Sequence, residues 1–518
     1  MARFFNTAGP CRPRDHYTVD SLPRIPQIRE LIEEKHYFVI HAPRQTGKTT
    51  FLYALMNHLN KEGKYTALTV NIQEAASGMD PAHAMMIAAN AIYDQARFHL
   101  PENERPEPTA KLDKETFSKG QLRGYLSRWS ENNSKPVVLF IDEADSLLDD
   151  LFLALLRQLR SGFEARPKGF PHSVALVGLR DVRDYKIRIR PERNSLGTGS
   201  PFNIKTKSVF MEGFTQPNVE TLLDMHTAET GQVFTKAVRD EIFRLTQGQP
   251  WLTNALANQI VFEILRKDYS VTITRAHVAQ ARQELIQRRD THLDSLIDKL
   301  REPAVKNVVQ AIIGGETLVS DRLNDDIAYV QDLGLITRQA PVKFANPIYA
   351  EIIPRVLNYS WQLSFNQDLV DQAWYVRDGR LDMDALLGAF QKFYRRHSDA
   401  WLEKYDFREV GRQLLLMAFL QRIINAGGNI EREMAVGNGR CDLLVEFGPD
   451  HFLIELKLRW DKYSKEEGLE QAARYLSRLE MDHGYLILFE TNPKVSWEER
   501  ISRKEVQQDG KQISLIGM

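Results

Sequence analysis

The run from His41 to Thr50, HAPRQTGKTT, constrains the fold of this chain more than any other stretch. Residues 37–40 before it are apolar and predict a buried strand, and residues 51–56 after it predict a helix. At the start of a helix, backbone N–H groups and the helix dipole favour a negative charge. The spacing matches the pattern GxxxxGK[ST], except that Ala42 replaces the first glycine. The run therefore predicts a phosphate-binding loop between a strand and a helix.

The side chains of this loop have distinct expected roles in holding a nucleotide. Lys48 would reach the β- and γ-phosphates of ATP, and the Thr49 hydroxyl would hold Mg²⁺. An alanine at position 42 is compatible with the loop if its φ is negative. We expect the nucleotide to be bound by Pro43, Arg44, Gln45, Thr46, Gly47, Lys48, Thr49 and Thr50. The alternative is a Gly-Lys-Thr turn of no consequence, which the flanking strand and helix disfavour.

The charge balance and the cysteine content exclude several classes of protein. The 518 residues carry 68 Lys and Arg against 69 Asp and Glu, so any nucleic-acid site must be a local patch. The two cysteines, Cys11 and Cys441, exclude a disulfide framework and a cysteine-rich zinc site. Because the sequence shows no apolar leader and no stretch of membrane-spanning length, we expect a cytoplasmic protein of three or four domains without a membrane contact.

A second stretch points to ATP hydrolysis. Residues 136–143, PVVLFIDE, join five apolar residues to two acids, as a central strand does when it ends beside a bound metal. Asp142 would bind Mg²⁺ directly or through water, and Glu143 would be the general base for the attacking water. Alone, such a run is more often a strand that meets solvent. Three further apolar runs complete a predicted parallel sheet of five strands in an α/β domain.

Two other segments could reach the same site. Between residues 180 and 190, three basic side chains alternate with isoleucine and share one face of an extended segment. This face is either a solvated edge or a contact for nucleic acid, and Arg180 or Arg183 could sense the γ-phosphate. The Pro- and Arg-rich N-terminal residues are either a tether or a wrap around the base of the nucleotide, with Tyr17 or Arg24 near the base.

A third motif, the turn Gly248-Gln249-Pro250, lies in the helical residues 216–268. Alone, it is a helix-initiating turn with proline where its missing N–H costs nothing. The P-loop, the Asp-Glu strand and this Gly-x-Pro turn together resemble the STAND/AAA-like ATPases of bacteria. The resemblance implies that Pro250 lies near adenine and relays the nucleotide state to a winged helix. It also implies a homo-oligomer in the ATP state, in which a neighbouring copy supplies an arginine.

The residues that follow have the pattern of such a winged helix. Helices are predicted at 304–313 and 325–333, and residues 335–344 could form a short hairpin wing. The second helix is net acidic, whereas a helix that reads DNA must face phosphates. We therefore expect this module to be an internal lever or contact surface and not a sequence reader.

The C-terminal part carries a second constellation of charged residues. After a predicted helix at 405–426, glycine-containing turns separate strands that should form an antiparallel meander. Alternation along the last of these strands places Glu455 and Lys457 on one face, with the intervening apolar residues entering the core. If Asp442 on the preceding strand comes alongside, two carboxylates and one ammonium meet. Oxygen ligands of this kind suit Mg²⁺.

These residues resemble the PD-(D/E)xK nuclease superfamily, in the branch attached to AAA-like ATPases. Asp442, Glu455 and Lys457 match its motif, and Gln471 matches a glutamine that would touch the scissile phosphate or the water. The resemblance implies that both acids bind Mg²⁺ or Mn²⁺, and Glu409 is a candidate for an upstream helical acid. Two alternatives stand beside this interpretation: a solvent-facing Glu455–Lys457 pair at a sheet edge, and a nuclease-like fold that has lost its chemistry.

The expected protein is an ATP-binding and ATP-hydrolysing molecule that controls an attached nuclease. Its substrate would be nucleic acid, DNA more than RNA, and the resemblance implies bacterial defence. The rival hypothesis is a nucleotide-switched STAND-type scaffold whose C-terminal domain binds nucleic acid or a partner without cleavage. The expected domains are a P-loop ATPase domain at 1–215, a helical lid at 216–300, a winged helix at 301–358, a helical connector at 359–400, and a PD-(D/E)xK restriction-endonuclease-like α/β domain at 401–518.

Overall fold

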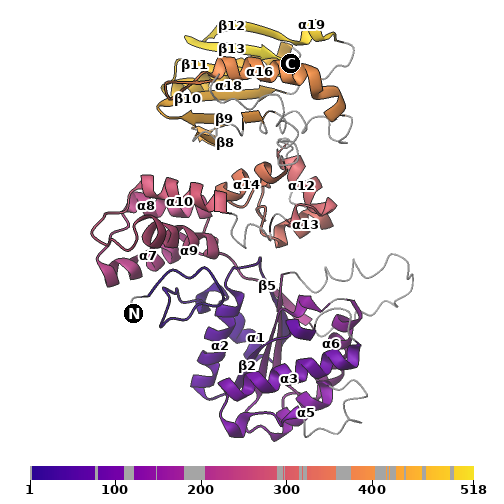
Figure 1. Ribbon diagram of the computed structural model, residues 1–518. Coiled ribbons are helices and arrows are strands. Elements are labelled where there is room, and N and C mark those ends of the chain that lie inside the picture. The colour runs from indigo at the N-terminus through magenta and orange to yellow at the C-terminus, as the bar shows by residue number, and fades with distance from the viewer. Residues whose placement is uncertain are drawn as a thin grey trace. The chain divides into compact units, whose positions relative to one another are not determined.

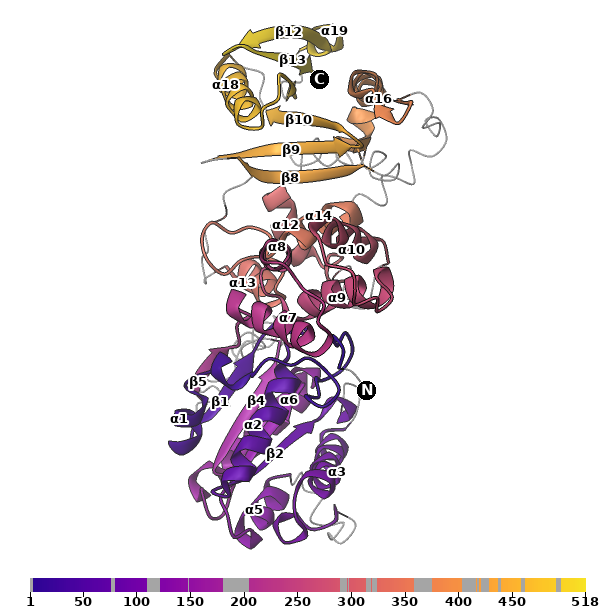
Figure 2. The same cartoon turned by 90° about the vertical axis from the view of Figure 1, so that its left-hand side faces the viewer.

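The computed structural model divides the chain into two compact units. The first comprises Met1–His292 and Asp321–Arg338, and the second comprises Leu293–Ser320 and Gln339–Met518. Figures 1 and 2 show their elements from two directions. The structure describes residues 3–75, 80–109, 122–147, 149–179, 205–288, 298–313, 324–357, 375–402, 429–436, 439–457, 462–490 and 495–518, and the single residues 296, 318, 416, 419, 420 and 428.

The first unit contains a five-stranded parallel sheet, as the sequence predicts. Its strand order is β2-β3-β4-β1-β5, and every neighbouring pair runs parallel. The first strand, β1, therefore lies between β4 and the edge strand β5, and the segments after β1 and β3 leave from the same edge. The strands are β1 (Tyr37–His41), β2 (Thr66–Asn71), β3 (Val137–Asp142), β4 (Ser173–Gly178) and β5 (Lys205–Phe210).

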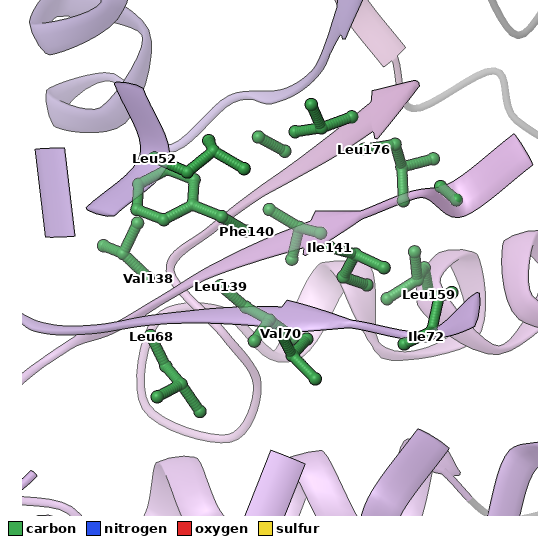
Figure 3. Packing of buried hydrophobic residues seen from close by; sticks show 14 of the residues in the cluster. Leu52, Leu68, Val70, Ile72, Val138, Leu139, Phe140, Ile141, Leu159 and Leu176 are labelled. Carbon is green, nitrogen blue, oxygen red and sulfur yellow. The ribbon is translucent and has the colours of Figure 1, made fainter. Parts of the chain in front are cut away.

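Helices enclose this sheet because its central strands are buried along their whole length. Figure 3 shows part of the resulting core, in which Leu52, Phe140 and Leu159 come from a helix, a strand and another helix. The helices are α1 (Ile28–Glu33), α2 (Lys48–Glu62), α3 (Pro81–His99), α5 (Leu122–Asn132) and α6 (Asp149–Gly162). Short 3-10 turns are η1 (Leu22–Arg24), η2 (Gln73–Ala75), η3 (Glu102–Glu104), η5 (Ala144–Ser146) and η6 (Phe163–Ala165).

A group of helices follows the sheet in the same unit. Thr215 starts the first of them with a capping box that it forms with Asn218, and Gly231 ends it with a φ of 77°. The helices are α7 (Gln216–Thr230), α8 (Lys236–Thr246), α9 (Pro250–Asn258), the π-helical turn η8 (Gln259–Ile264) and α10 (Arg275–Arg288). They occupy the region where a helical lid is expected.

The chain returns to the first unit through the segment 321–338, whose helix α13 spans Asp325–Asp332. Leu335 and Ile336, which were expected to begin a hairpin wing, are buried. Residues 335–344 have bridge residues at Ile336 and Phe344 but no continuous strand. The helices α12 (Pro303–Ile313) and α14 (Pro347–Leu357) belong to the second unit.

The second unit contains a six-stranded mixed sheet with the order β12-β13-β11-β10-β9-β8. The strands β8, β9 and β10 form the antiparallel meander that the turn residues predict, and β11 then runs parallel to β10. The strands are β8 (Asn429–Val436), β9 (Gly439–Phe447), β10 (Asp450–Lys457), β11 (His483–Leu488), β12 (Ser502–Gln508) and β13 (Lys511–Gly517). The remaining elements are β6 (Val376–Arg377), β7 (Arg380–Leu381), α16 (Met383–Leu402), α18 (Lys462–Arg478) and α19 (Trp497–Arg500).

The helices α16 and α18 pack on opposite faces of this sheet. Leu486 belongs to the apolar cluster beneath α18, whereas the hydroxyl of the adjacent Tyr485 donates to Asp384 of α16 over 3.1 Å. Adjacent strand residues face opposite sides, so the two helices do as well. The helix α16 lies where a connector is expected, and Gln391 ties it to the sheet by donating to the Gly517 carbonyl over 2.9 Å. No helix in the described part of the chain is long and apolar enough to cross a membrane.

Candidate functional site: a P-loop pocket and a buried carboxylate pair

The P-loop adopts a conformation that its residues make possible. Gly47 has a φ of 89° and caps the start of α2, a backbone geometry that glycine adopts without steric cost. Ala42 is outside the left-handed region, and its N–H donates to the Gly178 carbonyl over 3.2 Å. The alanine therefore continues the pairing of β1 with β4, which explains why the loop does not need a glycine there.

Lys48 is buried at the base of the loop. Its Nζ donates to the carbonyls of Ala42 over 2.9 Å and Pro43 over 3.1 Å. Burial lowers the pKa of this lysine, an effect that the nearby Glu143 and other acids oppose. An ammonium held only by neutral carbonyls is well placed to turn toward a phosphate.

The structure brings Asp142, the last residue of β3, and the following Glu143 to the start of α2. Thr49 Oγ1 donates to Asp142 Oδ2 over 2.7 Å, and the Glu143 N–H donates to Asp142 Oδ1 over 3.0 Å. Glu143 has a left-handed backbone, with φ 54°, which turns it away from the strand direction. Burial is the main cause that raises the pKa of both carboxyl groups. The Thr49 hydroxyl and the Asp142 carboxylate thus lie together at the start of α2, with Glu143 next to them.

Asp145 is a further member of this group that the sequence motif did not reveal. Its Oδ2 accepts from the Leu179 N–H over 2.9 Å, while its buried Oδ1 has no hydrogen-bond partner. A Cβ on Gly178 would lie 2.9 Å from that oxygen, so glycine leaves room for the carboxylate. Asp145 also contributes to raising the pKa of Glu143. In the sequence, the only indication that Asp145 belongs to this site is its position three residues after Asp142.

A cavity of about 430 Å³ opens beside the P-loop, which is large enough for a nucleotide. All the predicted nucleotide-binding residues except Pro43 line it, and Glu143 does too. The N-terminal arm and the helix α9 supply the remaining wall, including Tyr17, Arg24, Pro250, Trp251 and Asn254. Pro43 instead lies against Gly334, where an added Cβ would be 2.6 Å from the proline ring.

The N-terminal arm is fastened across this cavity by hydrogen bonds to two sides. The Cys11 N–H donates to Thr50 Oγ1 over 3.0 Å on the P-loop side. Trp251 Nε1 donates to the Thr7 carbonyl over 2.8 Å on the α9 side. The arm therefore forms part of the cavity wall.

The Gly-x-Pro turn is held against the linker between β5 and α7. Gly248 has a φ of 72°, and a Cβ there would lie 1.8 Å from the Phe214 carbonyl oxygen. The Phe214 N–H in turn donates to the Gly248 carbonyl over 2.7 Å. This close backbone crossing fixes the start of α9, and hence the place of Pro250 on the cavity wall.

The segment 321–338 closes the back of the P-loop. Asp332 forms an ion pair with Arg338, and the Nδ1 atom of His41 lies 3.7 Å from Asp332 Oδ1. The Arg338 guanidinium lies over the Phe210 ring, 3.6 Å from its centroid. The last residue of α13 thus lies beside β1 at His41, and Arg338, which follows the helix, lies over Phe210 of β5. The predicted basic face at 180–190 lies outside the described residues.

In the second unit, Asp442 and Glu455 lie on adjacent antiparallel strands. Leu453 pairs with Leu444, so continuing this register places Asp442 opposite Glu455. Asp442 Oδ2 accepts from the Leu456 N–H over 2.7 Å. Glu455 is 2 % exposed, and its Oε1 has no hydrogen-bond partner. Burial first, and the adjacent Asp442 second, raise the pKa of Glu455 to about 9.

Lys457 and Gln471 meet beside this carboxylate pair. Lys457 Nζ donates to Gln471 Oε1 over 2.8 Å and lies 3.9 Å from Glu467 Oε2. The close approach of α18 depends on Gly468, where a Cβ would lie 3.3 Å from Lys457 Cγ. The face that carries Glu455 and Lys457 is thus covered by α18. This burial contradicts the alternative of a solvent-facing Glu455–Lys457 pair.

The carboxylates alone do not complete a set of metal ligands. Across the ranges that the structure describes, no cluster of three or more His, Cys, Asp or Glu side chains is arranged to hold a metal ion. The candidate upstream acid, Glu409, lies outside the described residues, as does most of the helix predicted around it. Asp442 and Glu455 would therefore need water or backbone oxygen to complete the coordination of a cation.

Comparison with known proteins agrees with the geometry of the first unit. Residues 32–185 match the family model described as an AAA domain. Among solved structures, the Walker-type ATPase of Pyrococcus abyssi is 15% identical, with a TM-score of 0.46, over 67% of this chain and 99% of that chain. The ORC2 protein of Aeropyrum pernix, in ADPNP and ADP complexes, is 11% identical, with a TM-score of 0.40, over 68% and 96%.

A third similar structure is the RuvB Holliday junction branch migration motor of Thermotoga maritima. It is 14% identical, with a TM-score of 0.34, over 65% of this chain and 95% of that chain. No curated protein sequence matches. Since no quoted TM-score reaches 0.5, the assignment rests on the family match and on the geometry of the P-loop. The family match and the P-loop geometry together support an AAA-like P-loop ATPase domain in the first unit, which contains the parallel sheet.

Proposed function

We propose that the protein binds and hydrolyses ATP with Mg²⁺ in its first unit and thereby controls a metal-dependent nuclease in its second unit. In the ATPase site, the cavity holds the nucleotide, Thr49 and Asp142 hold the cation, and Glu143 orients and deprotonates the attacking water. Pro250 and the N-terminal arm enclose the base. In the nuclease site, the substrate is nucleic acid, with DNA favoured over RNA.

The observation that carries the nuclease proposal is the convergence of four polar side chains at one place in the sheet. Asp442 lies opposite Glu455, and Lys457 shares the face of Glu455 and bonds to Gln471. A structural ion pair would not require a glutamic acid that is 2 % exposed with an oxygen lacking a partner. A buried group of this kind, with a strongly perturbed pKa, is characteristic of functional sites.

The carboxylate pair fits a divalent cation chemically. Burial and the adjacent Asp442 raise the pKa of Glu455 although Lys457 opposes them, so without a cation Glu455 keeps a proton that a divalent cation would replace. A bound Mg²⁺ or Mn²⁺ would polarise a phosphodiester and lower the pKa of a bound water. Lys457 would stabilise negative charge on the phosphate, with Gln471 fixing its ammonium in place.

The segment 321–338 is the proposed route between the two activities. It touches the P-loop at Pro43 and the last residue of β1 at His41, and the chain continues from both its ends into the second unit. Movement of the P-loop on nucleotide binding would therefore displace this segment. Self-association in the ATP state also belongs to this proposal, and sedimentation that shows a monomer with and without ATP would remove it.

The ATPase half is tested by two substitutions that separate binding from hydrolysis. Lys48→Ala should abolish nucleotide binding, since it removes the buried ammonium. Glu143→Gln should bind ATP without turning it over. Hydrolysis by Glu143→Gln at the wild-type rate would show that Glu143 is not the general base.

The nuclease half is tested by incubating DNA and RNA with Mg²⁺ or Mn²⁺, with and without ATP. The wild-type chain should cut at least one of these substrates, and Lys457→Ala should not. Lys504→Ala is a matched control, because Lys504 is an exposed lysine on β12. Absence of cleavage by the wild-type protein under every condition would favour the rival function, a nucleotide-switched scaffold that binds a partner without cleavage.

A further inference from the structure

The N-terminal arm brings one arginine, Arg24, directly onto the P-loop. Its Nη1 donates to the Thr46 carbonyl over 2.9 Å and lies 3.3 Å from where a Cβ on Gly47 would be. Its Nε and Nη2 both donate to the Glu212 carbonyl, the former over 3.2 Å. The guanidinium also lies 5.3 Å from the centroid of the Phe214 ring. One side chain thus joins the P-loop to the linker that leads from β5 into α7.

All of these hydrogen-bond partners are neutral backbone carbonyls. Within the described residues, no carboxylate lies within ion-pair distance of Arg24. By contrast, Arg3 pairs with Glu229 at 2.9 Å, and Arg239 pairs with Asp224 at 2.7 Å. The acid that acts on Arg24 is Glu212, whose charge raises the pKa of Arg24 against the larger effect of burial.

The guanidinium retains both charge and donors for a ligand. Burial lowers the pKa of Arg24 to about 10, so the group stays protonated at neutral pH. Of its five N–H donors, three serve the carbonyls of Thr46 and Glu212. The side chain also lines the cavity beside the P-loop. The remaining donors are therefore available on a residue that a bound nucleotide would meet.

We propose that Arg24 is a phosphate-binding residue of the nucleotide site, acting together with Lys48 but supplied by the N-terminal arm. A guanidinium binds phosphate oxygens through paired N–H donors, and Arg24 keeps unused donors on the wall of the cavity beside the P-loop. Because Glu212 lies in the linker to α7, the same side chain transmits phosphate occupancy to the lid helices. This inference rests on the proposed nucleotide binding of the first unit.

The experiment compares the binding of ATP, ADP and adenosine to the full chain by calorimetry. Arg24→Gln should weaken ATP and ADP binding at least about tenfold, which corresponds to about 1.4 kcal/mol, and leave adenosine binding unchanged. Arg24→Lys, which keeps the charge, should recover part of the loss. Arg3→Gln, the matched control, removes an arginine of the same arm that pairs with Glu229 and should leave all three affinities unchanged.

The outcomes separate this inference from the proposed function on which it rests. Failure of the wild-type chain to bind any nucleotide would overturn the nucleotide site itself. Wild-type affinity for ATP in Arg24→Gln, or an equal loss for adenosine and ATP, would overturn only the role of Arg24. If Arg24→Gln does not fold, NMR of the wild-type chain replaces the calorimetric comparison. The Arg24 Nε–H resonance is assigned by its absence in Arg24→Lys. It should shift with ATP and not with adenosine, and equal responses to both would contradict the proposal.

Discussion

Replacement of Gly248 by alanine tests how the Gly-x-Pro turn positions the cavity wall. At this position a Cβ would lie 1.8 Å from the Phe214 carbonyl oxygen and 3.3 Å from the Phe214 nitrogen. The clash is with backbone, which cannot rotate away. Gly248→Ala should therefore separate the linker from the turn and displace Pro250 from the cavity.

The magnitude follows from three contributions. A left-handed backbone, with φ 72°, costs an alanine about 1–2 kcal/mol. Loss of the Phe214 N–H bond to the Gly248 carbonyl removes about 0.5–1.5 kcal/mol, and overpacking adds about 1–3 kcal/mol. Gly231→Ala is the matched control, because Gly231 has a φ of 77° with nothing within 4 Å of its Cβ position. Gly231→Ala should carry the backbone cost alone.

The assay compares both variants by urea unfolding of the full chain and by hydrogen exchange of α7 and α9. Gly248→Ala should be less stable than Gly231→Ala by roughly 1.5–4.5 kcal/mol, the sum of the bond and overpacking contributions. It should also bind ATP more weakly than the control. Equal stability and equal ATP affinity in the two variants would refute the account of this turn.

Three further predictions follow from the two sites and the segment between them. Glu143→Gln should keep wild-type ATP affinity while phosphate release slows about 100-fold or more, and an unchanged rate would contradict its role. In metal-free buffer, the wild type should lose stability relative to Glu455→Gln as the pH rises from about 5 to 9. In the folded state Glu455 keeps its proton up to a pKa of about 9, whereas in the unfolded chain it loses the proton near its ordinary pKa. Urea unfolding that gives the same stability difference between the two proteins at every pH would contradict the buried pair. In Gly334→Ala the new Cβ would lie 2.6 Å from Pro43, so the substitution should alter ATP affinity. The control is Gly63→Ala, where φ is 75° and nothing lies within 4 Å, and its ATP affinity should be unchanged in the same calorimetric titration.

The N-terminal site is largely predictable because its information is local. The P-loop, the strand before it and the helix after it are contiguous, so spacing alone placed Lys48 and Thr49 at the start of α2. Predicting that Asp142 and Glu143 lie near the P-loop required only the rule that parallel strands end at one edge of the sheet. Arg24 was named only as a residue near the base, because its contacts lie 22 and 188 residues away in sequence.

The segment after the lid shows the limit of local patterns. Leu335 and Ile336 have the apolar character of a strand, but the structure buries them beside a turn at Gly334. Which surface an apolar segment covers depends on the rest of the fold. In the C-terminal sheet, by contrast, alternation placed Glu455 and Lys457 on one face. The pattern did not show that α18 covers that face, since helix placement is a long-range property.

The most direct test of the central proposal is the binding of Mn²⁺ to the nucleotide-free chain. Calorimetry on the wild type should detect an ion that Glu455→Gln and Asp442→Asn no longer bind and that Lys48→Ala retains. Binding should also release a proton, because the buried carboxylate pair must ionise to accept the cation. Absence of Mn²⁺ binding to the wild type, or undiminished binding to Glu455→Gln, would contradict a metal-dependent nuclease at this site.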